Sequence, residues 1–358
     1  MPSRSVVVIG ASAGGHEALA TILGALPASL PACVLVVVHS SARGGMLLPD
    51  ILRRISALPV MFAGQGHQLR HGRVYLAPPD RHLLVKAQKL ALGHGPRENG
   101  FRPAIDPLFR TAARELGPRA IGVVLSGGLS DGTYGLSAIK KAGGVAIVQD
   151  PQEAIVGSMP LSAMSQVDVD HVAGAGEMAG LIERLVRAGY RGGGSSMSGR
   201  RAHPEPQLAS GLTDVADMNA QFGPSSGLTC PDCGGALWEV EDGRVVRYQC
   251  HVGHQYAPES LDAGQRDTID SALWAAVRVL EEHADLKARM ARRAGDRGLE
   301  AVAAGFVQGA KGARAQAERL RSIIMQSGSP VRAAERRAPA ARAARRGATR
   351  RGRKRRES

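Results

Sequence analysis

The sequence predicts an α/β fold with a doubly wound, mostly parallel sheet, followed by a small cysteine-containing ribbon-like unit and a helical hairpin. Short apolar runs alternate with helical patterns from Val6 to about Val186, which is typical of a sheet covered by helices on both faces. Three cysteines are grouped with histidines between Cys230 and His254. Two patterns with one apolar helical face follow them.

The expected strands of the first domain are short runs rich in Val, Ile and Leu: Val6–Ile9, Cys33–Val38, Val60–Ala63, Val74–Ala77, Ile121–Leu125 and Val145–Val148. Such runs do not alternate with polar residues, so they suit strands that are buried on both faces. Between them, apolar side chains recur at helical spacing from Ala18 to Leu26 and from Leu48 to Ile55. Residues 73–93 change to two or three short strands with a turn near Lys86 to Lys89, which predicts an antiparallel addition at one sheet edge.

Composition divides the chain further. Gly, Ser and Pro dominate the segment after the first domain, which predicts a flexible linker. The ribbon-like unit contains a hairpin that turns at Asp242-Gly243, and the two helices after it are joined by a short turn, so they should run antiparallel. The expected divisions are the α/β domain at 1–188, the linker at 189–227, the ribbon-like unit at 228–257, the helical hairpin at 258–326 and a disordered Arg-rich tail at 327–358.

Charge is unevenly distributed. The chain has 46 Lys+Arg and 32 Asp+Glu, a net charge of +14, of which the tail holds 12 basic and 2 acidic residues. The part expected to fold is therefore nearly balanced, and we expect the tail to contact polyanions only weakly. The sequence has no apolar run of membrane-spanning length and begins with a strand rather than a signal peptide, which predicts a cytoplasmic protein. Cysteines at metal spacing favour a reducing compartment, and Cys33 alone suits the core.

The first strand ends in a glycine-rich turn, Gly10-Ala-Ser12-Ala-Gly14-Gly15, that enters a helix. Such a turn exposes N–H groups to a phosphate or to a developing oxyanion. A dinucleotide site would need G-x-G-x-x-G and an acidic residue near the end of the second strand, but that strand ends at His39. A serine in the turn and a histidine at a neighbouring strand end predict a nucleophile and its base.

A third group would orient the imidazole. The strand Ile121–Leu125 leads into Ser-Gly-Gly-Leu-Ser-Asp131-Gly, which brings a carboxylate to the same sheet edge. Ser12, His39 and Asp131 therefore predict a catalytic triad. Taken singly, Ser12 is more often a helix N-cap or a phosphate contact, Asp131 more often a helix N-cap, and His39 more often a structural residue. The chain order differs from that of α/β-hydrolases and G-x-S-x-G is absent, so a different esterase scaffold is expected.

The sequence resembles the chemotaxis protein-glutamate methylesterases of the CheB type. The motifs that carry the resemblance occur in the family's order: Gly10–Gly15, His39, Leu76–His82, Arg102–Phe109 and Gly127–Gly132. The resemblance implies hydrolysis of glutamate γ-methyl esters on the cytoplasmic domains of methyl-accepting chemoreceptors, deamidation of receptor glutamines as a second activity, and no cofactor for catalysis. Asp80, His82, Arg102 and Asp106, which lie in these motifs, are candidates for cleft-lining roles or for roles that stabilise a loop or a helix cap.

The sequence departs from the family pattern at several positions. Val38 replaces a glutamine, Ala13 a threonine and Gly128 a methionine; the last two positions lie where the family shapes its oxyanion site. Five residues precede the first strand, so we expect the family's usual N-terminal receiver domain to be lacking.

The second constellation is Cys230-Pro-Asp-Cys233-Gly followed by Cys250-His-Val-Gly-His254. Two such pairs separated by a hairpin follow the zinc-ribbon plan, and thiolates with an imidazole suit tetrahedral zinc. We assign Cys230, Cys233, Cys250 and His254 as the ligands, with His251 as second choice because it adjoins Cys250. Four protein ligands close the coordination sphere, so the zinc should be structural.

The leading interpretation is a serine esterase in which Ser12 attacks, His39 transfers the proton and Asp131 orients His39. N–H groups of the Ala13 to Gly15 turn would stabilise the oxyanion. The alternative is a non-catalytic adaptor or nucleic-acid-binding protein that uses the zinc ribbon and the basic tail. An oxidoreductase is the third interpretation.

Overall fold

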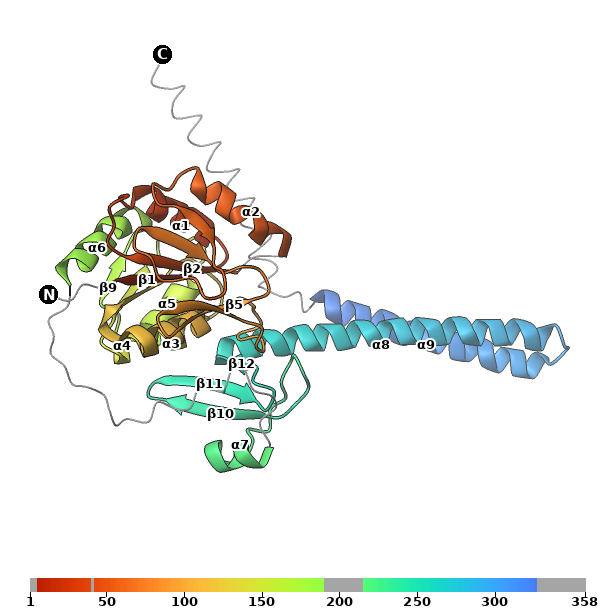
Figure 1. Ribbon diagram of the computed structural model, residues 1–358. Coiled ribbons are helices and arrows are strands. Elements are labelled where there is room, and N and C mark those ends of the chain that lie inside the picture. The colour runs from red at the N-terminus through yellow and green to blue at the C-terminus, as the bar shows by residue number, and fades with distance from the viewer. Residues whose placement is uncertain (1–4, 40–41, 190–214, 327–358) are drawn as a thin grey trace, which may run out of the picture. The chain divides into compact units, whose positions relative to one another are not determined.

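The computed structural model describes residues 5–39, 42–189 and 215–326 (Figure 1). The chain divides into two compact units, Met1–Asp262 and Ala263–Ser358. Most of the expected linker and the whole Arg-rich tail lie outside the described residues. Among the helices that are described, none has the length and apolar character needed to cross a membrane.

A seven-stranded parallel sheet forms the centre of the first unit, in the order β3-β4-β2-β1-β7-β8-β9. Its strands are β1 (Val6–Ala11), β2 (Cys33–Val38), β3 (Val60–Phe62), β4 (Arg73–Leu76), β7 (Ala120–Val124), β8 (Val145–Gln149) and β9 (His171–Ala173). The pairings Ala11 with Val38 and Gly10 with Val124 align the carboxyl ends of β2, β1 and β7. The predicted α/β fold is confirmed.

Helices cover both faces of this sheet (Figure 1). One face carries α1 (Gly15–Ala25), α2 (Ala42–Arg53) and α6 (Ala175–Ala188); the other carries α3 (Ile105–Leu116), the short 3₁₀ turn η1 (Gly117–Arg119), α4 (Thr133–Lys141) and α5 (Ser158–Gln166). Alternate side chains of β1 enter the two cores: Val7 and Ile9 join the first, Val6 and Val8 the second. A strand buried on both faces explains why its sequence is apolar without alternation.

The region 73–93 differs from the expectation in one respect. The strands β5 (His82–Lys86) and β6 (Lys89–Gly93) form a separate two-stranded sheet, so the predicted antiparallel addition to the edge of the main sheet is wrong. The hairpin instead buries Leu83, Val85 and Leu90 in the same core as α3. The Val85 N–H also donates to Thr111 Oγ1 of α3 at 3.1 Å. Burial against a helix therefore replaces pairing with the sheet.

The cysteine-containing unit is a three-stranded antiparallel sheet of β10 (Leu237–Asp242), β11 (Val245–Cys250) and β12 (Gln255–Tyr256). Just before it, α7 (Val215–Phe222) lies inside the segment expected to be a flexible linker, so that expectation is wrong for this helix. Met218 of α7 is buried, and Asn219 accepts a hydrogen bond from Trp238 Nε1 at 2.9 Å. Contact with β10 therefore stabilises a helix that the polar sequence did not suggest.

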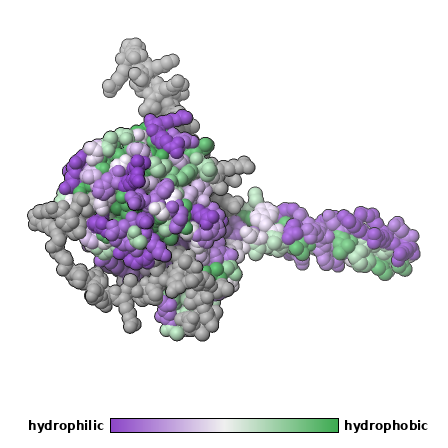
Figure 2. Space-filling view, in the orientation of Figure 1, coloured by the Kyte–Doolittle hydropathy of each residue, from purple (hydrophilic) through white to green (hydrophobic). Residues whose placement is uncertain are grey.

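The helices α8 (Pro258–Gly295) and α9 (Glu300–Gln326) form the predicted hairpin. Asp285 pairs with Arg314, and Glu281 pairs with Arg321. The earlier residue of α8 therefore contacts the later residue of α9, which shows that the two helices are antiparallel. Val277, Ala317 and Ile324 form the small core between them. The visible face of the hairpin is mostly hydrophilic, with hydrophobic side chains along part of one edge (Figure 2).

Candidate active site and metal centre

The three predicted triad residues meet at the carboxyl edge of the sheet. Ser12 follows β1, His39 follows β2, and Asp131 lies in the loop between β7 and α4. Because β2, β1 and β7 are neighbours in that order, their following residues converge. All three are buried, with exposed fractions of 8%, 8% and 1% for Ser12, His39 and Asp131.

Hydrogen bonds join these residues into a chain. His39 Nδ1 lies 3.2 Å from Ser12 Oγ, and His39 Nε2 lies 2.8 Å from Asp131 Oδ2. A carboxylate can only accept, so Nε2 carries the proton that it donates to Asp131. In the neutral imidazole this leaves the Nδ1 lone pair facing the Ser12 hydroxyl, as a general base requires.

Asp131 is held as a carboxylate by its donors. Oδ2 accepts from the backbone N–H of Ile105 at 2.7 Å, and Oδ1 accepts from Asn99 Nδ2 and the Gly132 N–H, each at 3.0 Å. Burial opposes ionisation, but the hydrogen bonds from His39, Ile105 and Asn99 hold the pKa of Asp131 below its usual range. Asp131 is therefore suited to stabilise an imidazolium.

Asp106 lies beside Asp131 without sharing its role. Burial and the neighbouring charge of Asp131 raise the pKa of Asp106 well above its usual range. Its Oδ1 accepts from the N–H groups of Gly132 and Gly135 at 3.1 and 2.7 Å. Asp131 carries the negative charge of this pair, and Asp106 stabilises the first turn of α4.

Two neighbours of the triad were not predicted. The ring of Phe101 stacks on His39 with centroids 3.7 Å apart and an interplanar angle of 7°. The side chain of Asn99 donates to both Asp131 and Asp106. The available signal was Glu98-Asn99-Gly100, a sequence typical of a tight turn, but nothing in the sequence showed that this turn faces the triad.

Glycine is required at two positions near Ser12, one in the turn that carries it and one in the loop after β7. Gly14 has φ of +74°, and a Cβ there would lie 2.5 Å from Ile155 Cβ. A Cβ at Gly127 would lie 2.2 Å from Met159 Sδ and 2.8 Å from Ser12 Cβ. The Gly15 N–H donates to the Ser12 carbonyl at 2.9 Å, so the expected oxyanion donors of this turn reduce to the N–H groups of Ala13 and Gly14.

The remaining candidates hold the loop before α3. Arg102 pairs with Asp80 at 2.7 Å, and its hydrogen bond lowers the pKa of the Asp80 carboxyl. His82 is fully buried; its Nε2 lies 2.9 Å from the Pro96 carbonyl, and its Nδ1 accepts from the Ala104 N–H at 3.3 Å. These contacts favour the loop-stabilising role over a cleft-lining one.

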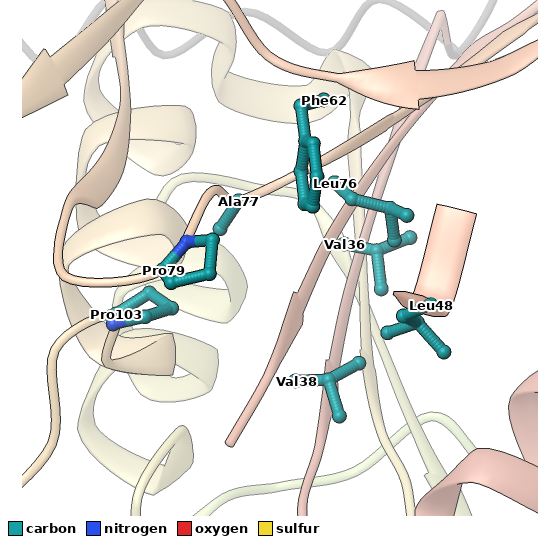
Figure 3. A pocket seen from close by; sticks show the side chains of 8 residues that line it. All are labelled: Val36, Val38, Leu48, Phe62, Leu76, Ala77, Pro79 and Pro103. Atoms are coloured by element: carbon teal, nitrogen blue, oxygen red, sulfur yellow. The ribbon is translucent and has the colours of Figure 1, made fainter. Parts of the chain in front are cut away.

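An apolar pocket lies beside the end of β2, and one of its lining residues, Val38, directly precedes His39 (Figure 3). Its side chains come from β2, β3, β4, α2 and the loops after β4 and before α3: Val36, Val38, Leu48, Phe62, Leu76, Ala77, Pro79 and Pro103. All of these side chains are apolar, so the pocket supplies no side chain that could act as an acid or a base.

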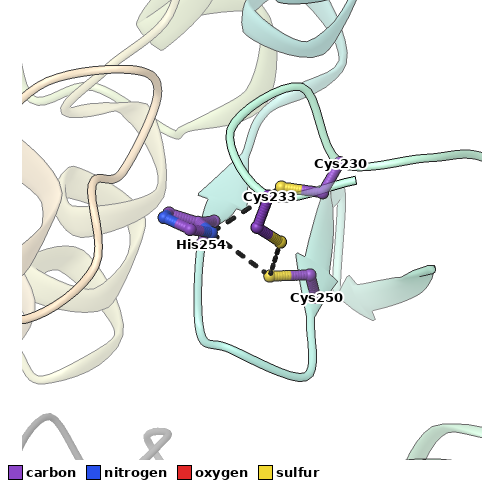
Figure 4. Close-up of side chains that lie close together, drawn as sticks. All are labelled: Cys230, Cys233, Cys250 and His254. Carbon is purple, nitrogen blue, oxygen red and sulfur yellow. Dashed lines mark hydrogen bonds between the residues drawn. The ribbon is translucent and has the colours of Figure 1, made fainter. Parts of the chain in front are cut away.

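The four expected metal ligands lie together at one end of the ribbon-like unit, and their donor atoms point toward one another (Figure 4). Cys233 Sγ lies 3.7 Å from Cys250 Sγ, Cys230 Sγ lies 3.7 Å from His254 Nδ1, and Cys250 Sγ lies 3.4 Å from the same nitrogen. A tetrahedral zinc ion with Zn–S bonds of about 2.3 Å sets its sulfur ligands roughly 3.8 Å apart. The donor set and its spacing fit such an ion.

Hydrogen bonding within this cluster favours the thiolate form of Cys230. The hydrogen bonds from Cys250 and His254 lower the pKa of the Cys230 thiol. The hydrogen bond between Cys250 and Cys230 raises the pKa of the Cys250 thiol. One negative charge is thus shared within the pair, and a divalent cation would stabilise the thiolate form of every cysteine.

Known proteins are similar to the half of the chain that carries the triad. Residues 7–182 fit the family described as CheB methylesterase. A relative from Leptospira interrogans is 40% identical over 180 residues, which span 50% of this chain and 93% of that protein. The chain belongs to the CheB methylesterase family.

Two further matches agree. A protein of Methanosarcina mazei, named protein-glutamate methylesterase/protein-glutamine glutaminase 2, is 38% identical over 192 residues, and the match spans 51% of this chain and 52% of that relative. The crystal structure of the Thermotoga maritima CheB methylesterase catalytic domain matches with a TM-score of 0.50 and 34% identity, covering 52% of this chain and all of that one. The ribbon-like unit and the helical hairpin lie beyond the residues that fit the family.

Proposed function

We propose that this chain is a protein-glutamate methylesterase that hydrolyses glutamate γ-methyl esters on chemoreceptor cytoplasmic domains, with deamidation of receptor glutamines as a second activity. The observation that carries the proposal is the hydrogen-bonded chain from Ser12 through His39 to Asp131 in a member of this family. These hydrogen bonds also argue against the adaptor interpretation. A histidine buried between a serine and a carboxylate is an arrangement typical of catalytic sites, and an inactive scaffold would not require it.

In the proposed mechanism, Ser12 Oγ attacks the ester carbonyl while His39 Nδ1 accepts its proton. Asp131 stabilises the resulting imidazolium through the Nε2–H bond. The tetrahedral intermediate collapses when His39 returns the proton to the methoxy oxygen, so methanol leaves and an acyl-enzyme remains on Ser12. Water then attacks the acyl carbonyl while His39 accepts its proton, and His39 returns that proton to Ser12 Oγ as the bond between Ser12 and the acyl group breaks and the glutamate is released.

The same steps describe deamidation. Ammonia replaces methanol as the leaving group, and His39 protonates the leaving nitrogen. In both reactions the N–H groups of Ala13 and Gly14 are the donors for the oxyanion in this turn. No step of the mechanism needs a cofactor.

The experiment that tests this function measures methanol release from methylated chemoreceptor membranes. We expect the purified full chain to release methanol with time, and ammonia from membranes whose receptors carry glutamine at the methylation positions. Unmethylated glutamate-form membranes are the control and should release neither product. Absence of methanol release from several methylated receptors would contradict the proposed function.

We further infer that Cys230, Cys233, Cys250 and His254 hold a structural zinc ion. The ribbon-like unit has a small apolar core, formed by Leu237, Tyr256 and Leu261 with two of the cysteines. So small a core supplies little folding free energy by itself, and a closed metal site compensates for it. All four positions are taken by protein ligands, so the ion has a structural role.

The zinc assignment predicts about one zinc per chain, because four protein ligands form one closed site. Cys233→Ser and His254→Ala should lose the metal and lower the melting temperature of the ribbon-like unit, as measured by elemental analysis and calorimetry. His251→Ala is the matched control, since this histidine adjoins the site but lies outside the cluster, and it should retain zinc. Full zinc content in His254→Ala with loss in His251→Ala would reverse the ligand assignment.

A further inference from the structure

A four-residue turn, Glu98–Phe101, lies between the triad and the ribbon-like unit. It is closed by hydrogen bonds in both directions between Glu98 and Phe101, at 3.2 and 2.9 Å. Its central residues, Asn99 and Gly100, have φ of +53° and +81°, the left-handed conformation that asparagine and glycine adopt at low cost. We call it the 98–101 turn.

One side of the 98–101 turn contacts the catalytic groups. Phe101 stacks on the His39 ring, and Asn99 Nδ2 donates to Asp131 Oδ1 at 3.0 Å. The same amide nitrogen donates to Asp106 at 3.1 Å. The turn therefore touches two of the three triad residues and supplies one of the donors that orient the Asp131 carboxylate.

The other side of the 98–101 turn is bonded to the ribbon-like unit. The Asn99 N–H donates to the Gln255 carbonyl at 2.7 Å, and the Ala257 N–H donates to Asn99 Oδ1 at 2.8 Å. Glu98 pairs with Gln255 in a parallel bridge. Asn99 is 5% exposed and Gln255 is 4% exposed, so water does not compete freely for these bonds.

A second contact secures the same strand. Arg247 of β11 hydrogen-bonds to Gln255, and its guanidinium lies 4.5 Å from the centre of the Tyr134 ring in α4. Gln255 directly follows His254, a proposed metal ligand, and β12 is only two residues long. We therefore expect a metal bound at His254 to help to hold β12 in place.

We propose that Asn99 is a positioning residue through which the metal-loaded ribbon-like unit sets the turnover of the esterase centre. The inference rests on the proposed function. When the metal holds β12, the Ala257 N–H donates to Asn99 Oδ1, and Asn99 Nδ2 is directed at Asp131. Loss of the metal releases β12, so that Asn99 and the Asp131 carboxylate each lose a restraint.

The test compares zinc-loaded full chain with Cys233→Ser and with Asn99→Gly. Glycine removes the Asn99 side chain but keeps the positive φ without strain. We expect each variant to lower kcat roughly 5- to 20-fold with KM within about twofold of wild type, the size of coupling found between residues in contact. The double variant should lose no more than either single one, because both remove the same restraint.

Lys141→Ala is the matched control. It removes an ion pair between α4 and Asp242 of the ribbon-like unit, 2.8 Å long, that does not involve Asn99, and kcat should stay within about twofold of wild type. Hydrogen exchange adds a readout that needs no substrate: peptides covering 98–101 and 255–258 should exchange faster in Cys233→Ser than in Lys141→Ala.

Three results would overturn the proposal. The first is an unchanged kcat in a Cys233→Ser chain that has lost its metal, and the second is losses that multiply in the double variant. The third is unchanged exchange at 98–101 after metal loss, which would refute the coupling even if the chain proved to have no esterase activity. Failure of the proposed function is recognised separately, by a wild-type chain that releases no methanol.

Discussion

Ser12→Ala is expected to lower methyl-ester hydrolysis by roughly 10⁴- to 10⁶-fold, because members of a catalytic triad act as a unit. The variant keeps the fold, since alanine fits the turn and the Ser12 backbone bonds to Ser126 and Gly15 remain available. Methanol release at saturating receptor membrane measures the effect. His39→Ala should cause a loss of the same size.

The control for this variant is Ser165→Ala, which removes a serine that is exposed on α5. Its rate should equal that of wild type. If Ser12→Ala or His39→Ala retained even a tenth of the wild-type rate, the triad assignment would be wrong.

Asp131→Asn is expected to lower the rate by roughly 10⁴-fold, the loss seen when an amide replaces the orienting carboxylate of a triad. An asparagine can turn its amide N–H toward Nε2, which moves the imidazole proton to Nδ1. The atom that faces Ser12 then carries a proton and cannot act as the base. The expected loss is in kcat, measured by methanol release.

Asp50→Asn is the matched control, because Asp50 is an exposed carboxylate on α2, paired with Arg53. It should leave kcat unchanged. A rate for Asp131→Asn within tenfold of wild type would show that Asp131 does not orient His39.

The main elements of the fold were predictable from the sequence because strands of a parallel sheet are buried on both faces. Continuous Val, Ile and Leu runs marked β1, β2, β7 and β8. The three-residue β9 carries too short an apolar run to be recognised, and its pairing with β8 supplies the missing stabilisation. The α7 helix depends on contacts with β10 that a local pattern cannot show.

The candidate site was predictable to a similar extent. Ser12, His39 and Asp131 each follow a strand, so topology alone brings them to one edge. Asn99 and Phe101 escaped notice because they lie in a loop, far in sequence from Ser12 and His39. Only the folded chain brings the 98–101 turn to His39, Asp131 and Gln255 together.

The most direct test of the central claim, that Ser12 is an activated nucleophile, is labelling of the full chain with a fluorophosphonate followed by peptide mass spectrometry. The triad predicts one label, on Ser12, with no label at that position in Ser12→Ala and greatly slowed labelling in His39→Ala. An unlabelled wild-type chain, or labelling of Ser12 at the same rate in His39→Ala, would contradict the account.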